Sequence, residues 1–424
     1  MGMNIVEKIM ARTSGRSVVR PGDLVVVKVE TAVLTDMAFI ADHSDKLKLP
    51  KTLHDPDKVI IINDHITPPK DRPTAEGVLR SRKFALKTGV RFHDIGANQG
   101  ICHQVLADHA YALPGTVLVC GDSHSCSSGA LNCCARGLGT TDILYTFCTG
   151  ETWFKVGETV RYEFTGELQK GVSAKDVFLY IAGKYGDHVN CNIEFGGPSA
   201  DSFSLDARRT LSTMAAEVSV EFAVWEPNAQ LAEYVKARNH RPFQMTYPDP
   251  DAVYLDVRAI DLNPIEPYVA LPDKVINNTV PVSQLGEKIK VDQCCVGSCA
   301  NSTLEDLEAV AEILKGRKIA DRVRFLVTPG SQVVYREAAK RGIINTLIEA
   351  GCLLTPPTCG VCAGLNNGVL AGEEVCITAT TRNFKGRMGS NSAKIYLGSP
   401  AVIAASAVTG FITDPRCFLE VNSK

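Results

Sequence analysis

Short apolar runs, each followed by a loop of small and polar residues, recur along the chain. Residues 59–62 read VIII and residues 116–120 read TVLVC. Residues 290–296 and 322–327 end in similar runs in the last third of the chain. Runs this short and apolar are typical of strands in parallel sheets, which are covered by helices on both faces. With a further strand expected at residues 24–29, the pattern predicts an α/β fold.

The stretches between these strands carry helical spacing and helix-start signals. Asn4 with Glu7 three residues later is a capping box, which predicts a helix through about residue 11. Residues 302–305 (STLE) form a second capping box, for a helix to about residue 314. Further helices are expected from residue 100 to near 114, from residue 140, and over residues 174–185, 209–220, 332–341, 344–350 and 399–409.

A chain of 424 residues is too long for a single compact core, so several domains are expected. The pattern of apolar and polar residues changes after residue 150. Apolar and polar residues alternate at positions 160–164, which predicts a half-exposed strand. Residues 261–272 contain three prolines and are the best candidate for a linker. We therefore expect three α/β domains, at residues 1–157, 158–272 and 273–424.

Composition and charge exclude several classes of protein. The net charge is −2, without the basic excess of a nucleic-acid-binding surface. The first nine residues lack the apolar core of a signal peptide, and no apolar run is long enough to span a bilayer. We expect a cytoplasmic protein whose fifteen cysteines are reduced. Several of them lie in apolar surroundings and are expected to be small buried hydrophobic residues: Cys120, Cys133, Cys134, Cys294 and Cys295.

Aspartate and histidine follow two of the predicted buried strands. Asp64 and His65 follow residues 59–62 after Asn63, and Asp122 and His124 come after residues 116–120. Open α/β sheets bind ligands at the carboxyl ends of their strands. Asp64 alone would be explained as a turn-capping residue. Two such pairs at equivalent places favour a functional site.

Three cysteines have a pattern that indicates a metal centre. Cys359 and Cys362 form a C-x-x-C pair in a Gly-rich loop, and Cys299 lies in a second short loop upstream. Three thiolates without an obvious fourth suggest an iron–sulfur cluster with one open iron. A structural zinc site using the same cysteines and a histidine is the alternative, but it would leave the Asp/His pairs unexplained.

Two arginines and one glutamate extend the candidate site. Arg382 and Arg387 share one short loop, and arginine forks bind carboxylates in a bidentate manner; solvated surface arginines are the plainer interpretation. Glu217 has small and apolar neighbours, so it is either partnered or functional. Together these groups suit an iron that polarises the hydroxyl of a di- or tricarboxylate. Dehydration also needs a base on the opposite side, for which the chain offers no persuasive candidate.

Six motifs occur in an order that resembles the aconitase superfamily over nearly the whole chain. They are Asp64-His65, GICHQ at residues 100–104, GDSH at 121–124, GSCAN at 297–301, Cys359-x-x-Cys362 and RNFxGR at 382–387. In length and opening, the chain is most similar to the large subunits of the two-subunit members, the 3-isopropylmalate dehydratases and homoaconitases.

The resemblance implies the fold and the roles of the site residues. It implies three α/β domains around one [4Fe-4S] cluster, held by Cys299, Cys359 and Cys362, with one iron not ligated by cysteine. The swivelling fourth domain that carries the catalytic base would be absent, and a separate small subunit would supply it. The resemblance implies acid–base roles for Asp64, His65, His103, Asp122, His124 and Glu217, and substrate contacts for Ser123, Arg382 and Arg387.

The implied activity is that of a hydro-lyase acting on a hydroxy-dicarboxylic acid, with 3-isopropylmalate dehydration in leucine biosynthesis as the leading hypothesis. The chain departs from the family pattern at Ala300, Ser125 and residues 132–136 and 363–367. Homoaconitate, maleate, citraconate and dimethylmalate therefore remain alternative substrates. A non-catalytic iron–sulfur sensor or RNA-binding relative is the alternative from another class, and the near-neutral charge disfavours it.

Overall fold

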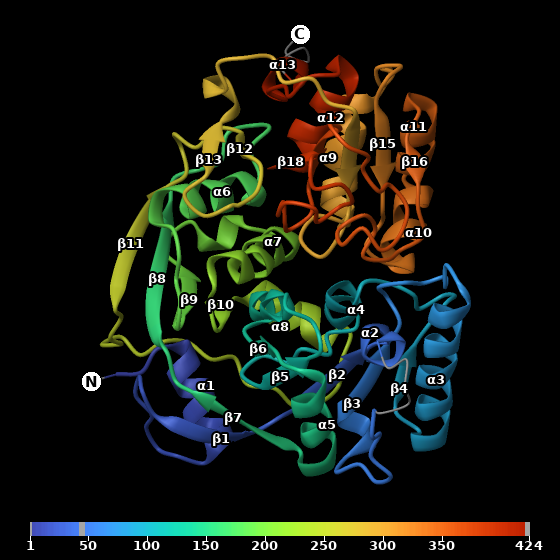
Figure 1. Ribbon diagram of the computed structural model, residues 1–424. Coiled ribbons are helices and arrows are strands. Elements are labelled where there is room, and N and C mark those ends of the chain that lie inside the picture. The colour runs from blue at the N-terminus through green and yellow to red at the C-terminus, as the bar shows by residue number, and fades with distance from the viewer. Residues whose placement is uncertain (1, 42–46, 420–424) are drawn as a thin grey trace. The chain divides into compact units, whose positions relative to one another are not determined.

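The computed structural model describes residues 2–41 and 47–419, and these form two compact units (Figure 1). Unit 1 comprises Met1–Ile95, Cys102–Thr165 and His188–Ile260. Unit 2 comprises Gly96–Ile101, Gly166–Asp187 and Asp261–Lys424. The outermost ends of the predicted first and third domains, residues 1 and 420–424, lie outside the described residues. The division into three domains stays a prediction.

A five-stranded parallel sheet forms the first layer of unit 1. Its strand order is β4-β3-β2-β5-β6. The bounds are β2 Thr31–Thr35, β3 Val59–Ile62, β4 Arg91–His93, β5 Val117–Cys120 and β6 Cys134–Gly137. Every residue of β2, β3 and β5 is buried, which confirms the interpretation of the apolar runs. Because the strands are parallel, their carboxyl ends meet at one edge of the sheet.

The helices of unit 1 match the sequence prediction unevenly. Helix α1 (Ile5–Ser14) begins at the predicted Asn4–Glu7 capping box, a motif that stabilises a helix start by about 1 kcal/mol. Helix α4 (Cys102–Asp108) is shorter than expected because Ala110 has a φ of 47°, which ends the helical path before Pro114. The remaining helices are α2 Asp36–Ile40, α3 Arg72–Thr88, α5 Thr140–Thr149, α7 Leu205–Ala215 and α8 Ala229–Lys236.

A four-stranded sheet of order β10-β9-β8-β11 forms the second part of unit 1. The bounds are β8 Glu158–Thr165, β9 Cys191–Gly196, β10 Ala223–Trp225 and β11 Asp256–Asp261. The prediction of a strand at residues 160–164 is confirmed by β8, but the expectation that it is half-exposed was wrong, since β8 is mostly buried. The ring of Phe164 packs against Trp225, with ring centroids 5.7 Å apart. A two-stranded antiparallel ribbon completes unit 1, with β1 at Leu24–Lys28 and β7 at Glu151–Lys155.

Unit 2 is built on a seven-stranded sheet of order β13-β12-β18-β17-β14-β15-β16. The five strands from β18 to β16 are parallel, and β12 and β13 are antiparallel additions. The bounds are β12 Tyr268–Ala270, β13 Thr279–Pro281, β14 Gln293–Val296, β15 Arg324–Val327, β16 Leu353–Leu354, β17 Val375–Thr378 and β18 Lys394–Gly398. The predicted linker at residues 261–272 starts at a unit boundary but also contains β12, so it is partly sheet.

Helices pack on this sheet around one core that includes Val296, Leu307 and Phe325. The bounds are α6 Ala174–Tyr185, α9 Leu304–Leu314, α10 Gln332–Lys340, α11 Ile343–Ala350, α12 Pro400–Thr409 and α13 Arg416–Leu419. The capping box of α9 lies one residue later than predicted: Thr303 caps the helix and Asp306 reciprocates. Because residues 305 and 306 are both acidic, the sequence fits a capping box at 302–305 as well as one at 303–306.

Candidate active site

The carboxyl ends of three neighbouring strands in unit 1 carry acidic and histidine side chains, and two of these strands carry predicted acid–base residues. Asp64 and His65 follow shortly after the end of β3 at Ile62, and Asp122 and His124 follow shortly after the end of β5 at Cys120. Between them lies β2, which runs directly into Asp36, the first residue of α2. Parallel strands deliver all of these side chains to the same edge of the sheet. Asp36 was missed in the sequence, although the apolar run at 31–35 followed by an aspartate is the same signal as in β3.

His65 and Asp64 form the first predicted pair. The His65 Nδ1 atom lies 2.7 Å from Asp64 Oδ1. The other oxygen of Asp64 accepts the backbone N–H of Cys102 at 2.7 Å. The carboxyl group is fully buried, and this burial raises the pKa of Asp64 against the opposing effect of His65. Both oxygens of Asp64 are therefore used to hold His65 and the start of α4.

Asp122 is the centre of the second pair. His103 Nε2 donates to Asp122 Oδ1 at 2.7 Å, and the backbone N–H of His124 donates to the same oxygen at 2.8 Å. Asp122 Oδ2 lies 3.4 Å from His65 Nε2, so the two predicted pairs face each other. Burial alone would raise the pKa of Asp122, but the hydrogen bonds from the histidines outweigh it and hold that pKa well below the ordinary value. Asp122 is therefore an anion at neutral pH.

Glu217 joins this network through His124. The His124 Nε2 atom donates to Glu217 Oε1 at 2.8 Å, and both side chains are buried. Glu217 lies in the short 3-10 turn Ala216–Val218 that follows α7, 93 residues away in the chain. Of the two interpretations left open, the glutamate is thus partnered. Ser123 is exposed, and its Oγ lies 3.5 Å from His124 Nδ1, so its side chain borders the acid–base network.

The three predicted cluster cysteines all belong to unit 2 and are nearly buried. Cys299, Cys359 and Cys362 are 7%, 8% and 6% exposed, and Cys299 packs with Cys359 in one small cluster. Both cysteine loops approach Thr328, just past β15. A Cβ atom on Gly297 would lie 2.6 Å from Thr328 Cβ, and one on Gly360 would lie 2.8 Å from Thr328 Oγ1. Glycine is therefore required at both positions for the two loops to converge.

The chemistry around these cysteines fits an iron–sulfur cluster. Sulfur donors from two loops are gathered, and they are nearly but not wholly shielded from solvent. Ser298, which precedes Cys299, has a φ of 83°, a strained value for a residue other than glycine. Within residues 2–41 and 47–419, its buried Oγ has no hydrogen-bond partner. A hydroxyl held in this way is a ready donor to a bound sulfide or thiolate.

The arginine loop lies against the C-x-x-C loop within unit 2. The Arg387 Nε atom donates to the carbonyl oxygen of Cys362 at 2.8 Å, and its Nη2 lies 3.8 Å from Cys362 Sγ. The fully buried Lys175 donates from Nζ to the carbonyls of Ala379 and Thr380, at 3.1 and 2.9 Å, which anchors the chain just before Arg382. The guanidinium of Arg387 thus contacts a cysteine that was predicted to bind the cluster.

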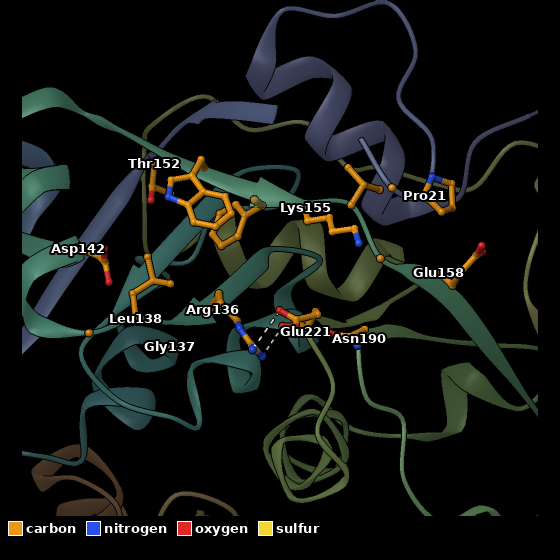
Figure 2. A pocket seen from close by; sticks show the side chains of 16 residues that line it. Pro21, Arg136, Gly137, Leu138, Asp142, Thr152, Lys155, Glu158, Asn190 and Glu221 are labelled. Atoms are coloured by element: carbon orange, nitrogen blue, oxygen red, sulfur yellow. Dashed lines mark hydrogen bonds and ion pairs between the residues drawn. The ribbon is translucent and has the colours of Figure 1, made fainter. Parts of the chain in front are cut away.

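A cavity of about 680 Å³ opens elsewhere in unit 1 (Figure 2). Arg136 and Glu221 point toward each other in its wall and form an ion pair at 3.0 Å. Its lining also includes Asp142 of α5 and Trp153 and Lys155 of β7. None of the predicted site residues lines it, so it is distinct from the acid–base network. Across the described ranges, the chain has no helix long and apolar enough to cross a membrane.

Comparisons with known proteins agree over nearly the whole length. The model of the aconitase family (aconitate hydratase) matches residues 10–410. A 3-isopropylmalate dehydratase large subunit of Mycolicibacterium smegmatis is 46% identical over 417 residues, which cover 98% of this chain and 97% of that protein. The 3-isopropylmalate dehydratase large subunit 1 of Pyrococcus furiosus is 40% identical over 98% of this chain and 99% of its own.

A further relative is named for a different substrate. The "Probable methanogen homoaconitase large subunit" of Methanothermobacter thermautotrophicus is 39% identical over 98% of both chains. The family model and all three relatives span the sheet edge with the histidines as well as the cysteine loops. This chain therefore belongs to the aconitase family.

Proposed function

We propose that this chain is the large subunit of a two-subunit hydro-lyase that interconverts 2- and 3-isopropylmalate in leucine biosynthesis. Two relatives named for that reaction, at 46% and 40% identity over nearly the full length, support the choice of substrate. Homoaconitate is the second candidate, because a relative named for it is almost as similar, at 39%. The free, buried thiols of Cys133, Cys134 and Cys294 suit a reducing compartment, in support of a cytoplasmic location.

The observation that carries the proposal is the network around Asp122. His103, His124 and His65 all face this one carboxylate, and Glu217 holds the far side of His124. Elimination of water needs a proton delivered to a poor leaving group, and a carboxylate-held imidazole can deliver it. We assign proton delivery to the departing hydroxyl to His65, with Asp64 fixing its ring. We assign orientation of the water to His124 and Glu217.

The aconitase family implies an iron–sulfur cluster. We propose that Cys299, Cys359 and Cys362 hold one [4Fe-4S] cluster in this chain. When bound, the cluster supplies a Lewis-acidic iron that weakens the bond between the hydroxyl oxygen and carbon. Ser298 and Arg387 are proposed to hold the surrounding loops. Arg382, with the exposed Ser123 and the outer nitrogen of Arg387, is proposed to bind the substrate carboxylates.

The base that removes the carbon-bound proton is proposed to lie on a separate small subunit. The relatives' names describe them as large subunits, which supports such a partner. The partner is also proposed to contact the variable group of the substrate. Neither nucleic acid nor a membrane is part of the proposal, in keeping with the net charge of −2.

An anaerobic turnover panel tests this function directly. The chain, with its cluster reconstituted and its candidate small subunit added, is assayed with 2- and 3-isopropylmalate, homoaconitate, citraconate, maleate and dimethylmalate. We expect preferential turnover of isopropylmalate, and no turnover by the large subunit alone, because the base is proposed to lie on the small subunit. Preference for another acid would reject the substrate but keep the mechanism. Robust turnover by the single chain would reject the divided active site.

A further inference from the structure

Asp36 occupies the middle of the acid–base edge, and no step of the proposed reaction uses its side chain. It follows β2, the strand that lies between β3, which carries Asp64 and His65, and β5, which leads to Asp122. Its side chain is fully buried. Burying a carboxylate costs free energy unless hydrogen bonds compensate for the lost water, so Asp36 must have partners inside the protein.

Among residues 2–41 and 47–419, the hydrogen bonds and the ion pair of the Asp36 carboxylate go to one short loop. Its Oδ1 atom accepts the backbone N–H of His65 at 3.2 Å, and its Oδ2 atom accepts the backbone N–H of Ile66 at 3.0 Å. The same Oδ1 atom lies 3.3 Å from His65 Nδ1. The side chain of Asp36 therefore holds two successive backbone N–H groups and also faces the imidazole ring of His65.

Asp64 cannot do this work in place of Asp36. It is the chain neighbour of His65, so it moves with the same loop, and its second oxygen is bound to the N–H of Cys102. Asp36 comes from a different strand and links the loop to the centre of the sheet. Both carboxylates face the Nδ1 side of the ring, while Asp122 faces the Nε2 side. Carboxylates thus face both nitrogens of the His65 ring, and Asp36 also holds the backbone of residues 65 and 66.

The ionisation of Asp36 agrees with this geometry. Burial would raise the pKa of Asp36, but the hydrogen bond and charge of His65, with the two backbone amides, lower it below the ordinary value. The buried group therefore stays an acceptor for both amides rather than becoming a hydroxyl donor.

We propose that Asp36 is a positioning residue for His65: it locks residues 64–66 so that His65 Nε2 points to the reacting groups beside Asp122. The inference rests on the proposed function, because His65 is taken there as the proton donor. A purely structural anchor would affect folding alone. A positioning residue must affect the chemical step more than substrate binding.

The test compares Asp36→Asn and Asp36→Ala in the large subunit with its cluster and small subunit. Asparagine keeps the shape and one acceptor oxygen, but turns an amino group toward an N–H donor. We expect kcat to fall about tenfold in Asp36→Asn and about 100-fold in Asp36→Ala, the range for groups that orient a reacting residue, with KM changed less than about threefold. Amide hydrogen exchange of the peptide covering residues 63–67 in the large subunit should accelerate in the same order.

Asp57 is an exposed aspartate of the same unit, and Asp57→Asn is the matched control. Its kcat and its hydrogen exchange at residues 63–67 should equal those of the wild type. Unchanged kcat in both Asp36 variants would overturn the inference, and so would unchanged exchange at residues 63–67. A rise in KM as large as the expected fall in kcat would mark Asp36 as a substrate-binding residue. That result would also overturn the inference. If the wild-type complex turns over none of the acids, the proposed function fails. The exchange data then decide by themselves whether Asp36 locks the loop.

Discussion

Replacing Cys359 by serine is expected to remove both the iron and the activity of this chain. Wild-type protein reconstituted without oxygen should bind about four irons and four inorganic sulfides, the content of one [4Fe-4S] cluster. The variant should bind less than about one iron and show no measurable turnover, since the proposed mechanism uses the open iron to activate the hydroxyl. Iron, zinc and sulfide analysis with the absorption spectrum of the cluster measures the first effect, and the anaerobic assay measures the second.

Cys352→Ser is the matched control for this loss. Cys352 belongs to the same unit and is 7% exposed, against 8% for Cys359, but it lies outside the two cysteine loops. It should keep the full iron content, with at most about 1–2 kcal/mol lost from the free energy of unfolding for a buried polar substitution. Full iron in Cys359→Ser would refute the assigned ligand. One zinc per wild-type chain, in place of iron, would support the structural zinc alternative.

The sequence was most informative where local pattern and tertiary environment agree. The run at residues 59–62 is apolar throughout because β3 is buried on both faces, and the Asn4 capping box starts α1 as predicted. The aconitase resemblance, which rests on six separate motifs, is confirmed by a family match over residues 10–410. Short motifs of this kind predict local structure reliably because each is one contiguous stretch of the chain.

The misses have physical causes that local sequence does not contain. Helix α3 went unpredicted although Asp71 caps it, because its 17 residues are polar on most of their surface and give a weak apolar signal. Strand β8 alternates in sequence but is covered on both faces by residues from distant strands. The partnership of His124 with Glu217 spans 93 residues. No spacing rule could link them, and the same applies to Asp36 and His65, which meet only because β2 and β3 are neighbours.

Asp122→Asn is expected to give the largest kinetic loss without loss of the cluster. Asparagine keeps the size of the side chain but removes the charge that His103, His124 and His65 face. We expect kcat to fall about 10²–10⁴-fold, the range for a general acid–base group, which corresponds to about 3–5 kcal/mol of transition-state stabilisation. The pKa of Asp122 lies well below its ordinary value, so the wild-type group is an anion at every pH of the assay. The loss should therefore be nearly constant between about pH 6 and 9.

Asp142→Asn separates this effect from a general consequence of removing a carboxylate from unit 1. Asp142 is exposed, lies on α5, and lines the cavity that contains none of the site residues. The control should keep wild-type kcat and KM. Asp122→Asn should keep about four irons, since its loss is one of proton chemistry and not of cluster binding. A variant that lost iron in parallel with kcat would show that Asp122 supports the metal centre. A variant with wild-type kcat would remove the network from the mechanism and leave the cysteine loops as the sole reactive part of the chain.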